Sequence, residues 1–126
     1  MKGDYQAGVC NIGPNEILRR KRVGYMGLAL SISTVLMMTL GTVSRPTRFL
    51  VVVPAMIAAT GFIQARKKFC LGFGLAGTFN FGKLGEFSKV ETAEFRAADR
   101  AMVIRIFLQA AAIALAVGVI FVALPL

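Results

Sequence analysis

The amino-acid sequence predicts an all-α membrane protein that crosses a bilayer with three transmembrane helices. Hydrophobic residues make up 56% of the 126 residues and charged residues 17%, whereas soluble globular domains contain about 45–50% and about 25% respectively. The charges are also gathered into short clusters that alternate with long uncharged runs. A soluble protein would spread its charges along every amphipathic element. We therefore expect a single membrane domain over residues 1–126.

The amino-terminal segment, residues 1–22, precedes the first uncharged run and is expected to be cytoplasmic. Pro14 suits the first turn of a helix, and Glu16 would interact favourably with the positive end of the helix dipole. Glu16 also stands four residues before Arg20, a spacing that supports a helix. The segment ends in four cations that are expected to fix the topology and contact anionic lipid headgroups: Arg19, Arg20, Lys21 and Arg22.

Residues 23–65 are predicted to form an antiparallel hairpin of two transmembrane helices. Residues 23–43 carry no charge, and as a helix they would be about 31 Å long, which matches the hydrocarbon core of a bilayer. Pro46 lies in a tight turn and can begin the second helix, residues 49–65. This run is short, but flanking arginines can extend it by reaching the headgroups: Arg45 and Arg48. A second basic cluster follows it: Arg66, Lys67 and Lys68.

Residues 66–102 are expected to form a cytoplasmic and interfacial segment. Residues 69–82 contain four glycines and four phenylalanines and are too few to cross a bilayer as a helix, so an interfacial or re-entrant segment is expected. Ser88 to Glu91 matches a capping box, which predicts a cytoplasmic surface helix over residues 88–100. Three glycines also match a dinucleotide-binding pattern, but that pattern requires a βαβ unit, which is not predicted here: Gly72, Gly74 and Gly77.

The last segment, residues 103–126, is predicted to hold the third transmembrane helix over residues 103–125, because residues 106–126 carry no charge. Arg105 stands in the first turn and is expected to reach back toward the headgroups. Gln109 lies one turn deeper, within expected reach of a Ser or Thr of the first span. The carboxylates before this helix alternate with cations, which is typical of a solvated helix face: Glu91, Glu94 and Asp99.

The distribution of cations predicts the orientation. With the amino terminus in the cytoplasm, thirteen of the fifteen Lys and Arg residues lie on the cytoplasmic side, and only Arg45 and Arg48 lie outside. Short loops rich in Lys and Arg stay on the cytoplasmic side of membranes. We therefore expect a protein of the bacterial inner (cytoplasmic) membrane with its carboxyl terminus outside.

Rows of small residues mark the faces on which membrane helices approach closely. One such face is predicted on each span. These faces either pack together within one chain or dock on a larger membrane complex, and both interpretations remain open. The residues are Gly24, Gly27, Ser31 and Thr34 on the first span, Ala55 and Ala59 on the second, and Ala111, Ala114 and Gly118 on the third.

Little in the sequence indicates catalysis, so we expect no catalytic residue, no cofactor and no metal. The chain has no histidine, and its two cysteines, Cys10 and Cys70, form neither a Cys-x-x-Cys pair nor a metal-ligand spacing. The net charge of +9 invites a nucleic-acid interpretation, but the basic clusters adjoin apolar spans, which favours lipid contact and no nucleic acid. Cys70 lies near cations that favour a thiolate, which makes it a candidate reactive thiol. The alternative is a structural thiol.

The stretch from Arg19 to Gly77 resembles a family of small inner-membrane hairpin proteins found beside, or fused to, rhodanese sulfurtransferase domains. In that family the cysteine follows a Gly-Phe pair almost directly and precedes a proline, whereas here residues 63–69 intervene and no proline follows. The resemblance implies a membrane-embedding module with sulfur-related partners and puts Cys70 forward. It rests on Arg19–Arg22, Pro54, Thr60–Phe62, Cys70, Leu71, Leu75 and Gly77.

These observations predict a non-enzymatic accessory or scaffold subunit that packs into a larger membrane protein complex. Its expected partners are anionic membrane lipids and other membrane protein subunits. One alternative is a thiol- or sulfur-handling membrane protein that uses Cys70. Another is a small homo-oligomeric channel or transporter, although no acidic residue falls within a predicted span.

Overall fold

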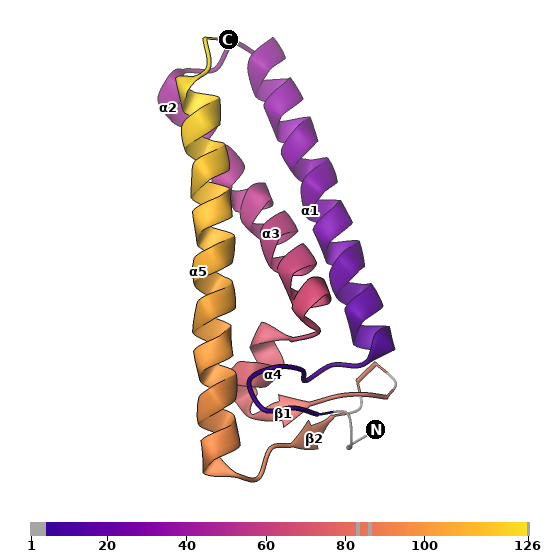
Figure 1. Cartoon of the computed structure of the whole chain (residues 1–126). Coiled ribbons are helices and arrows are strands. Elements are labelled where there is room, and N and C mark those ends of the chain that lie inside the picture. Colours follow the sequence, from indigo (N-terminus) through magenta and orange to yellow (C-terminus); the bar gives the residue numbers. More distant parts are fainter. Residues whose placement is uncertain (1–4, 83, 86, 126) are drawn as a thin grey trace.

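Three long helical rods make up most of the structure (Figure 1). The computed structural model describes residues 5–82, 84–85 and 87–125. Each rod is long and apolar enough to cross a membrane, so the prediction of three such helices is confirmed. The first rod is α1 (Pro14–Leu40); the second joins α2 (Arg45–Arg48), the 3-10 turn η2 (Phe49–Val51) and α3 (Val52–Lys67); the third is α5 (Ala93–Ala123).

The rods begin earlier than the uncharged runs that predicted them. α1 starts at Pro14, which occupies the first turn, whereas the predicted span starts at residue 23. The second rod starts at Arg45, next to Pro46, where residue 49 was predicted. Charged residues are as good helix formers as apolar ones, so each helix continues beyond its apolar stretch. The basic run Arg19–Arg22 is therefore part of α1.

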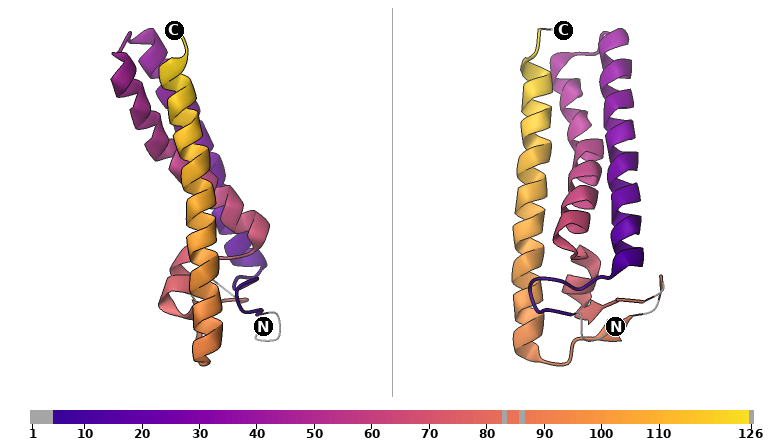
Figure 2. Two further views of the ribbon diagram at one scale, coloured as in Figure 1. Left: turned by 60° about the vertical axis from the view of Figure 1, so that its left-hand side comes forward. Right: turned by 45° about the vertical axis from the view of Figure 1, so that its right-hand side comes forward.

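The rods lie in one layer, with α3 between α1 and α5 (Figure 2). α1 packs mainly on α3, and α3 packs on α5. In the apolar 18-residue stretch of α1, 11% of the residues are buried within the chain. In the corresponding stretch of the middle rod, 44% are buried. A layer of this kind leaves most of the α1 surface uncovered by the rest of the chain.

Glycine permits the close contact between α1 and α3. A Cβ atom added to Gly27 would lie 2.3 Å from the backbone nitrogen of Ala58, and one added to Gly61 would lie 2.4 Å from that of Gly24. No side chain fits at these positions, so the two backbones touch directly, as in other small-residue contacts between membrane helices. Ser31 and Thr34 are predicted to share this face, and both are half-buried. Each hydroxyl donates to the carbonyl oxygen four residues back: Ser31 to Gly27 O (2.8 Å) and Thr34 to Leu30 O (2.7 Å).

The contact between the middle rod and α5 uses alanine and one glycine. Ala55, Ala59 and Ala114 are buried, and Gly118 faces the side chains of Val52 and Phe49. Ala111 is only half-buried, and its neighbour Ala110 is fully buried instead. Near the lower end of α5, an apolar core forms from Phe69, Val103 and Ile106.

The end of the bundle at which α1 and α5 begin carries a folded platform, which we define as residues 5–13, 68–82 and 87–92 (Figure 1). It contains the short helix α4 (Leu71–Ala76) and two short strands, β1 (Thr78–Phe79) and β2 (Ser88–Lys89). The strands pair antiparallel, with Thr78 opposite Lys89 and Phe79 opposite Ser88. The amino-terminal stretch joins through a parallel bridge between Ile12 and Asn80.

Two predictions fail in the platform. The helix predicted over residues 88–100 is wrong at its start, because Ser88 lies in β2 and α5 begins only at Ala93. The pairing with β1 and a hydrogen bond from Val90 N to Gly77 O (2.7 Å) hold this stretch extended. From Ala93 the chain is one continuous helix rather than a separate surface helix. The chain is otherwise mostly helical, which is compatible with the predicted all-α membrane protein, and the short strands β1 and β2 form a small sheet within it. Segment 69–82 is not part of a longer helix.

Candidate functional site

A hydrogen-bonded polar cluster lies inside the platform, beneath α1 and α3. At its centre, the buried side chain of Asn11 binds the backbone of Cys70 on both sides. Its Oδ1 accepts from Cys70 N at 2.7 Å, and its Nδ2 donates to Cys70 O at 3.2 Å. The backbone of Asn11 also receives a bond from Asn80 N (2.9 Å) and donates to Lys68 O (3.1 Å). One asparagine therefore ties the amino-terminal stretch to the chain on both sides of α4.

A buried carboxylate, that of Glu16, joins the cluster through Asn80. The Glu16 side chain is 1% exposed, and its Oε1 lies 3.4 Å from Arg20 Nη1 in an ion pair. Its Oε2 accepts a hydrogen bond from Asn80 Nδ2 at 3.3 Å. Buried carboxylates require such partners, because removing an unpaired charge from water is very costly. The spacing of Glu16 and Arg20 in the sequence thus corresponds to a real ion pair, but one in the interior.

Arg20 links this ion pair to the sulfur of Cys70. Its Nη2 donates to Cys70 Sγ at 2.7 Å while its Nη1 faces Glu16. Cys70 is 4% exposed, so the thiol is enclosed by the platform. Cys10, the other cysteine, lies half-buried and donates from its Sγ to Ile12 O at 3.6 Å. The cations that the sequence placed nearest to Cys70, at 66–68, are not the ones that contact its sulfur in the described structure.

A second buried amide side chain, that of Gln64, lies where the chain leaves α3 and enters the platform. Gln64 donates from Nε2 to Thr60 O (3.0 Å) and accepts from Leu71 N at Oε1 (2.9 Å). Between them, Lys68 ends α3 in the left-handed conformation (φ 56°). Gln64 thus satisfies the first free backbone N–H group of α4, which a helix start otherwise leaves unpaired.

Asp99 anchors the amino-terminal stretch to α5. The side chain is fully buried, and it accepts from Tyr5 Oη at 2.6 Å and from Gly8 N at 2.7 Å. The expectation that Asp99 belongs to a solvated helix face is wrong, because its partners come from more than 90 residues earlier in the chain. Burial and the neighbouring Asp99 carboxylate raise the pKa of Tyr5 above its usual value. The Tyr5 ring also stacks on Phe79 with 4.7 Å between centroids.

Comparisons with protein-family models, curated proteins and solved structures give no match for this chain.

The geometry of the cluster is that of a structural core. Each of its buried side chains binds the backbone of another element or another member of the cluster, and together they close the platform against the helices: Asn11, Glu16, Gln64, Asn80 and Asp99. Among the described residues, no group of three or more His, Cys, Asp or Glu side chains has the arrangement of a metal site. Sequence reasoning missed this cluster because its members carry no local signal beyond the spacing of Glu16 and Arg20.

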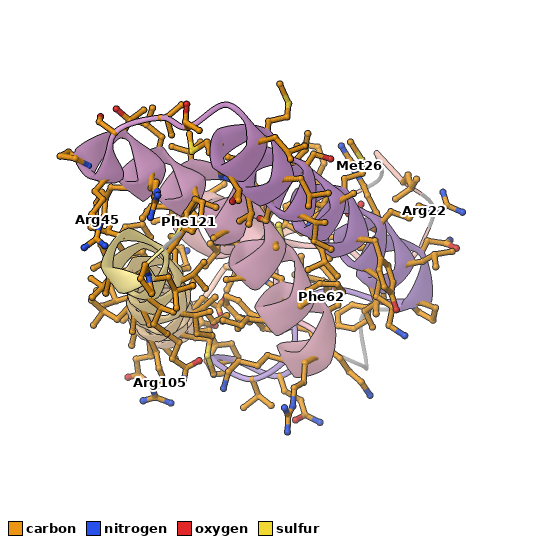
Figure 3. The ribbon with its side chains drawn as sticks, turned by 90° about the horizontal axis from the view of Figure 1, so that it is seen from above. Arg22, Met26, Arg45, Phe62, Arg105 and Phe121 are labelled. Carbon is orange, nitrogen blue, oxygen red and sulfur yellow. The ribbon has the colours of Figure 1, made fainter. Side chains whose placement is uncertain are left out.

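The predicted basic residues separate into distinct environments. Arg19 and Arg22 are exposed on α1, and Figure 3 shows Arg22 pointing away from the helices. Lys21, Arg66 and Lys68 line an open groove of about 500 Å³ between α1 and α3. Lys67 and Arg66 line a second groove of about 470 Å³ between α3 and α5.

Two further polar residues of the helices differ from the predictions. Gln109 lines the groove between α3 and α5, so it lies on the wrong side of α3 to reach a Ser or Thr of α1. Arg48 is only 5% exposed and does not extend outward. It donates from Nη1 to Leu124 O at 3.0 Å and lies over the Phe121 ring, 5.6 Å from its centroid. Arg48 therefore closes the carboxyl end of α5, while Arg105 points outward (Figure 3).

Proposed function

We propose that the chain is a non-enzymatic accessory subunit of a larger membrane protein assembly, inserted with the platform on the cytoplasmic side. Three membrane-length helices support insertion. The platform end holds the basic runs Arg19–Arg22 and Arg66–Lys68, and the opposite end holds Arg45 and Arg48. The positive-inside rule favours the platform end as cytoplasmic. A bacterial inner membrane is the setting that this arrangement fits.

The observation that carries the accessory role is the uncovered surface of α1. Within α1, only three residues are buried, two of them the glycines that contact α3. The rest of its apolar length presents large side chains, among them Met26 and Met37, which are 63% and 74% exposed. Methionine-rich helix surfaces adapt readily to a partner. The buried polar side chains of the platform are, in contrast, engaged in holding the fold.

Photo-crosslinking from the α1 surface tests this role. A photoreactive residue replaces Met26 or Met37 in the full chain, and Ile120 on the exposed face of α5 serves as the matched control position. We expect one discrete protein adduct, of the same mass, from both α1 positions and none from Ile120. Native gels after mild detergent extraction should show the chain well above its own 13.5 kDa. Recovery as a lone monomer with lipid adducts alone would refute the accessory role.

Thiol chemistry at Cys70 is the second candidate, favoured by the 2.7 Å contact between Arg20 Nη2 and the sulfur. Arginine beside a sulfur is typical of reactive cysteines, although those are also partly accessible. The resemblance to rhodanese-associated hairpins implies the same residue. Growth or sulfur transfer should then fail in Cys70→Ser and persist in Cys10→Ser. Equal behaviour of both variants would eliminate this candidate and leave the accessory role unaffected.

A further inference from the structure

The groove between α1 and α3 combines positive charge with an aromatic wall. It has a volume of about 500 Å³, and it opens at the platform end of the two helices. Lys21 comes from α1, and Arg66 comes from the last turn of α3, with Lys68 immediately after it. Tyr25 and Phe62 line the same groove from the two helices. Three cations thus surround one end of a surface that is otherwise apolar.

These three cations are available to a ligand. All three residues are exposed. Between described residues the one ion pair joins Arg20 and Glu16, so none of the three cations is paired with a described carboxylate. Arg20 turns inward to Glu16 and Cys70, whereas Lys21, the next residue along the helix, faces the groove.

Lys68 stands at a backbone position where a lysine is unusual. It ends α3 with φ 56°, a left-handed conformation that glycine adopts with less strain than any other residue. Helix termination alone would favour glycine here. The lysine instead adds a third cation to the groove, which makes Lys68→Gly a substitution that removes the charge without straining the backbone.

The aromatic wall is built into the contact between the helices. Tyr25 and Phe62 meet edge to face, with 5.0 Å between their ring centroids. The Phe62 ring is seated over Gly24, where an added Cβ atom would come within 2.8 Å of ring carbons. Figure 3 shows Phe62 on the middle helix, and Gly24 and Tyr25 are neighbours on α1. The wall is therefore fixed by the glycine contact, and it is positioned beside the cations.

We infer that this groove binds one phospholipid with a net negative headgroup, its phosphate among Lys21, Arg66 and Lys68 and an acyl chain along Tyr25 and Phe62. Charge complementarity selects an anionic headgroup, because three cations face the groove. The apolar wall selects an amphiphile over a free anion. Tyrosine is also enriched at the depth where headgroups meet acyl chains, and basic pockets between membrane helices bind anionic headgroups. The inference rests on the membrane insertion proposed above and deepens it to one site.

Native mass spectrometry of the full chain tests the site. The protein is purified in detergent micelles supplemented with phosphatidylglycerol or phosphatidylcholine of identical acyl chains. The groove variant is Lys21→Gln with Lys68→Gly. The matched control, Arg19→Gln with Lys67→Gln, also loses two positive charges, but at positions outside this groove. Since each cation near an anionic headgroup contributes about fivefold to binding, the groove variant should retain roughly twenty-five-fold less phosphatidylglycerol. The control should retain as much as the unmodified chain.

Three outcomes would overturn the inference. Equal loss of lipid in the two double variants would indicate diffuse attraction to the basic surface. Equal retention of phosphatidylglycerol and phosphatidylcholine by the unmodified chain would remove the headgroup selection. Displacement of the lipid by inorganic phosphate would show that the cations take a free anion. Carbonate extraction of membranes separates these results from a failure of insertion: a chain that stays in the pellet but shows no lipid selection refutes the site alone.

Discussion

Asn11 forms two hydrogen bonds with the backbone of Cys70, accepting from its N–H at 2.7 Å and donating to its carbonyl at 3.2 Å. The two residues are 59 positions apart, and both are buried. This pairing closes the platform under the helices, and it allows a direct test of what the platform contributes to stability.

Replacing Asn11 with Ala should be the most damaging change in the platform. It leaves the buried N–H of Cys70 without its partner, whereas the Cys70 carbonyl keeps the bond from Gly74 N (2.9 Å). We expect a cost of about 1–3 kcal/mol in the free energy of unfolding. Reversible unfolding in mixed detergent, followed by circular dichroism, measures the loss. Asn15→Ala is the control, because Asn15 is exposed and makes one bond, to Gly82 O at 3.2 Å. Similar losses in both variants would contradict a special role for Asn11.

Gly27→Ala should separate α1 from α3. The new Cβ atom would lie 2.3 Å from the backbone nitrogen of Ala58, which cannot move without moving the helix. We expect a loss of about 1–3 kcal/mol, the usual cost of overpacking, measured by the same unfolding assay. Gly72→Ala should be close to neutral, because its Cβ atom would find only Cys70 Sγ, 3.8 Å away. A tolerated Gly27→Ala would refute the close helix contact.

Alkaline pH should loosen the anchor between Tyr5 and Asp99. Burial, and then the Asp99 carboxylate, raise the pKa of Tyr5 above the value of about 10 for a free tyrosine. A raised pKa contributes stability that is fully present below pH 10 and is lost as the pH rises above it. The unmodified chain should therefore lose more stability above pH 10 than Tyr5→Phe does. Thermal unfolding at pH 8 and pH 11 compares them; parallel losses would contradict the assignment.

Arg48→Gln should loosen the carboxyl end of α5. It removes the bond to Leu124 O and the contact with the Phe121 ring, which together should contribute about 1–2 kcal/mol. Hydrogen exchange should speed up in the last turn of α5 and remain unchanged near its start. Arg45→Gln is the control, since Arg45 is exposed. Faster exchange along the whole of α5 would instead indicate global unfolding.

The sequence predicts the three long helices because long apolar runs without charge are typical of transmembrane helices. Pro14 and Pro46 stand in the first turns of their helices, as expected. The start of α5 could not be predicted, since the capping-box pattern at Ser88 is a local signal. The pairing of Ser88 with Phe79 and of Lys89 with Thr78, both earlier in the chain, overrides that signal.

The polar cluster was not predictable for a related reason. Glu16 and Asp99 resemble solvated helix residues in the sequence, and what buries them comes from distant segments. Asn80 reaches Glu16 across 64 positions, and Tyr5 reaches Asp99 across 94. Neither partner has a periodic or spaced pattern that would indicate the contact. Local patterns therefore predict the helices, and only the tertiary structure shows the platform.

The unbroken course of α5 has a mechanical consequence. Its 31 residues make a pillar of about 46 Å, against a hydrocarbon core of about 30 Å. In the proposed orientation, the lower end of this pillar stands clear of the acyl chains. It carries Asp99, and through Tyr5 and Gly8 it carries the amino-terminal stretch as well. A thinner bilayer that tilts α5 would move residues 5–13 together with the lower end of the helix. Bilayer thickness would then determine the position of the platform relative to the membrane surface.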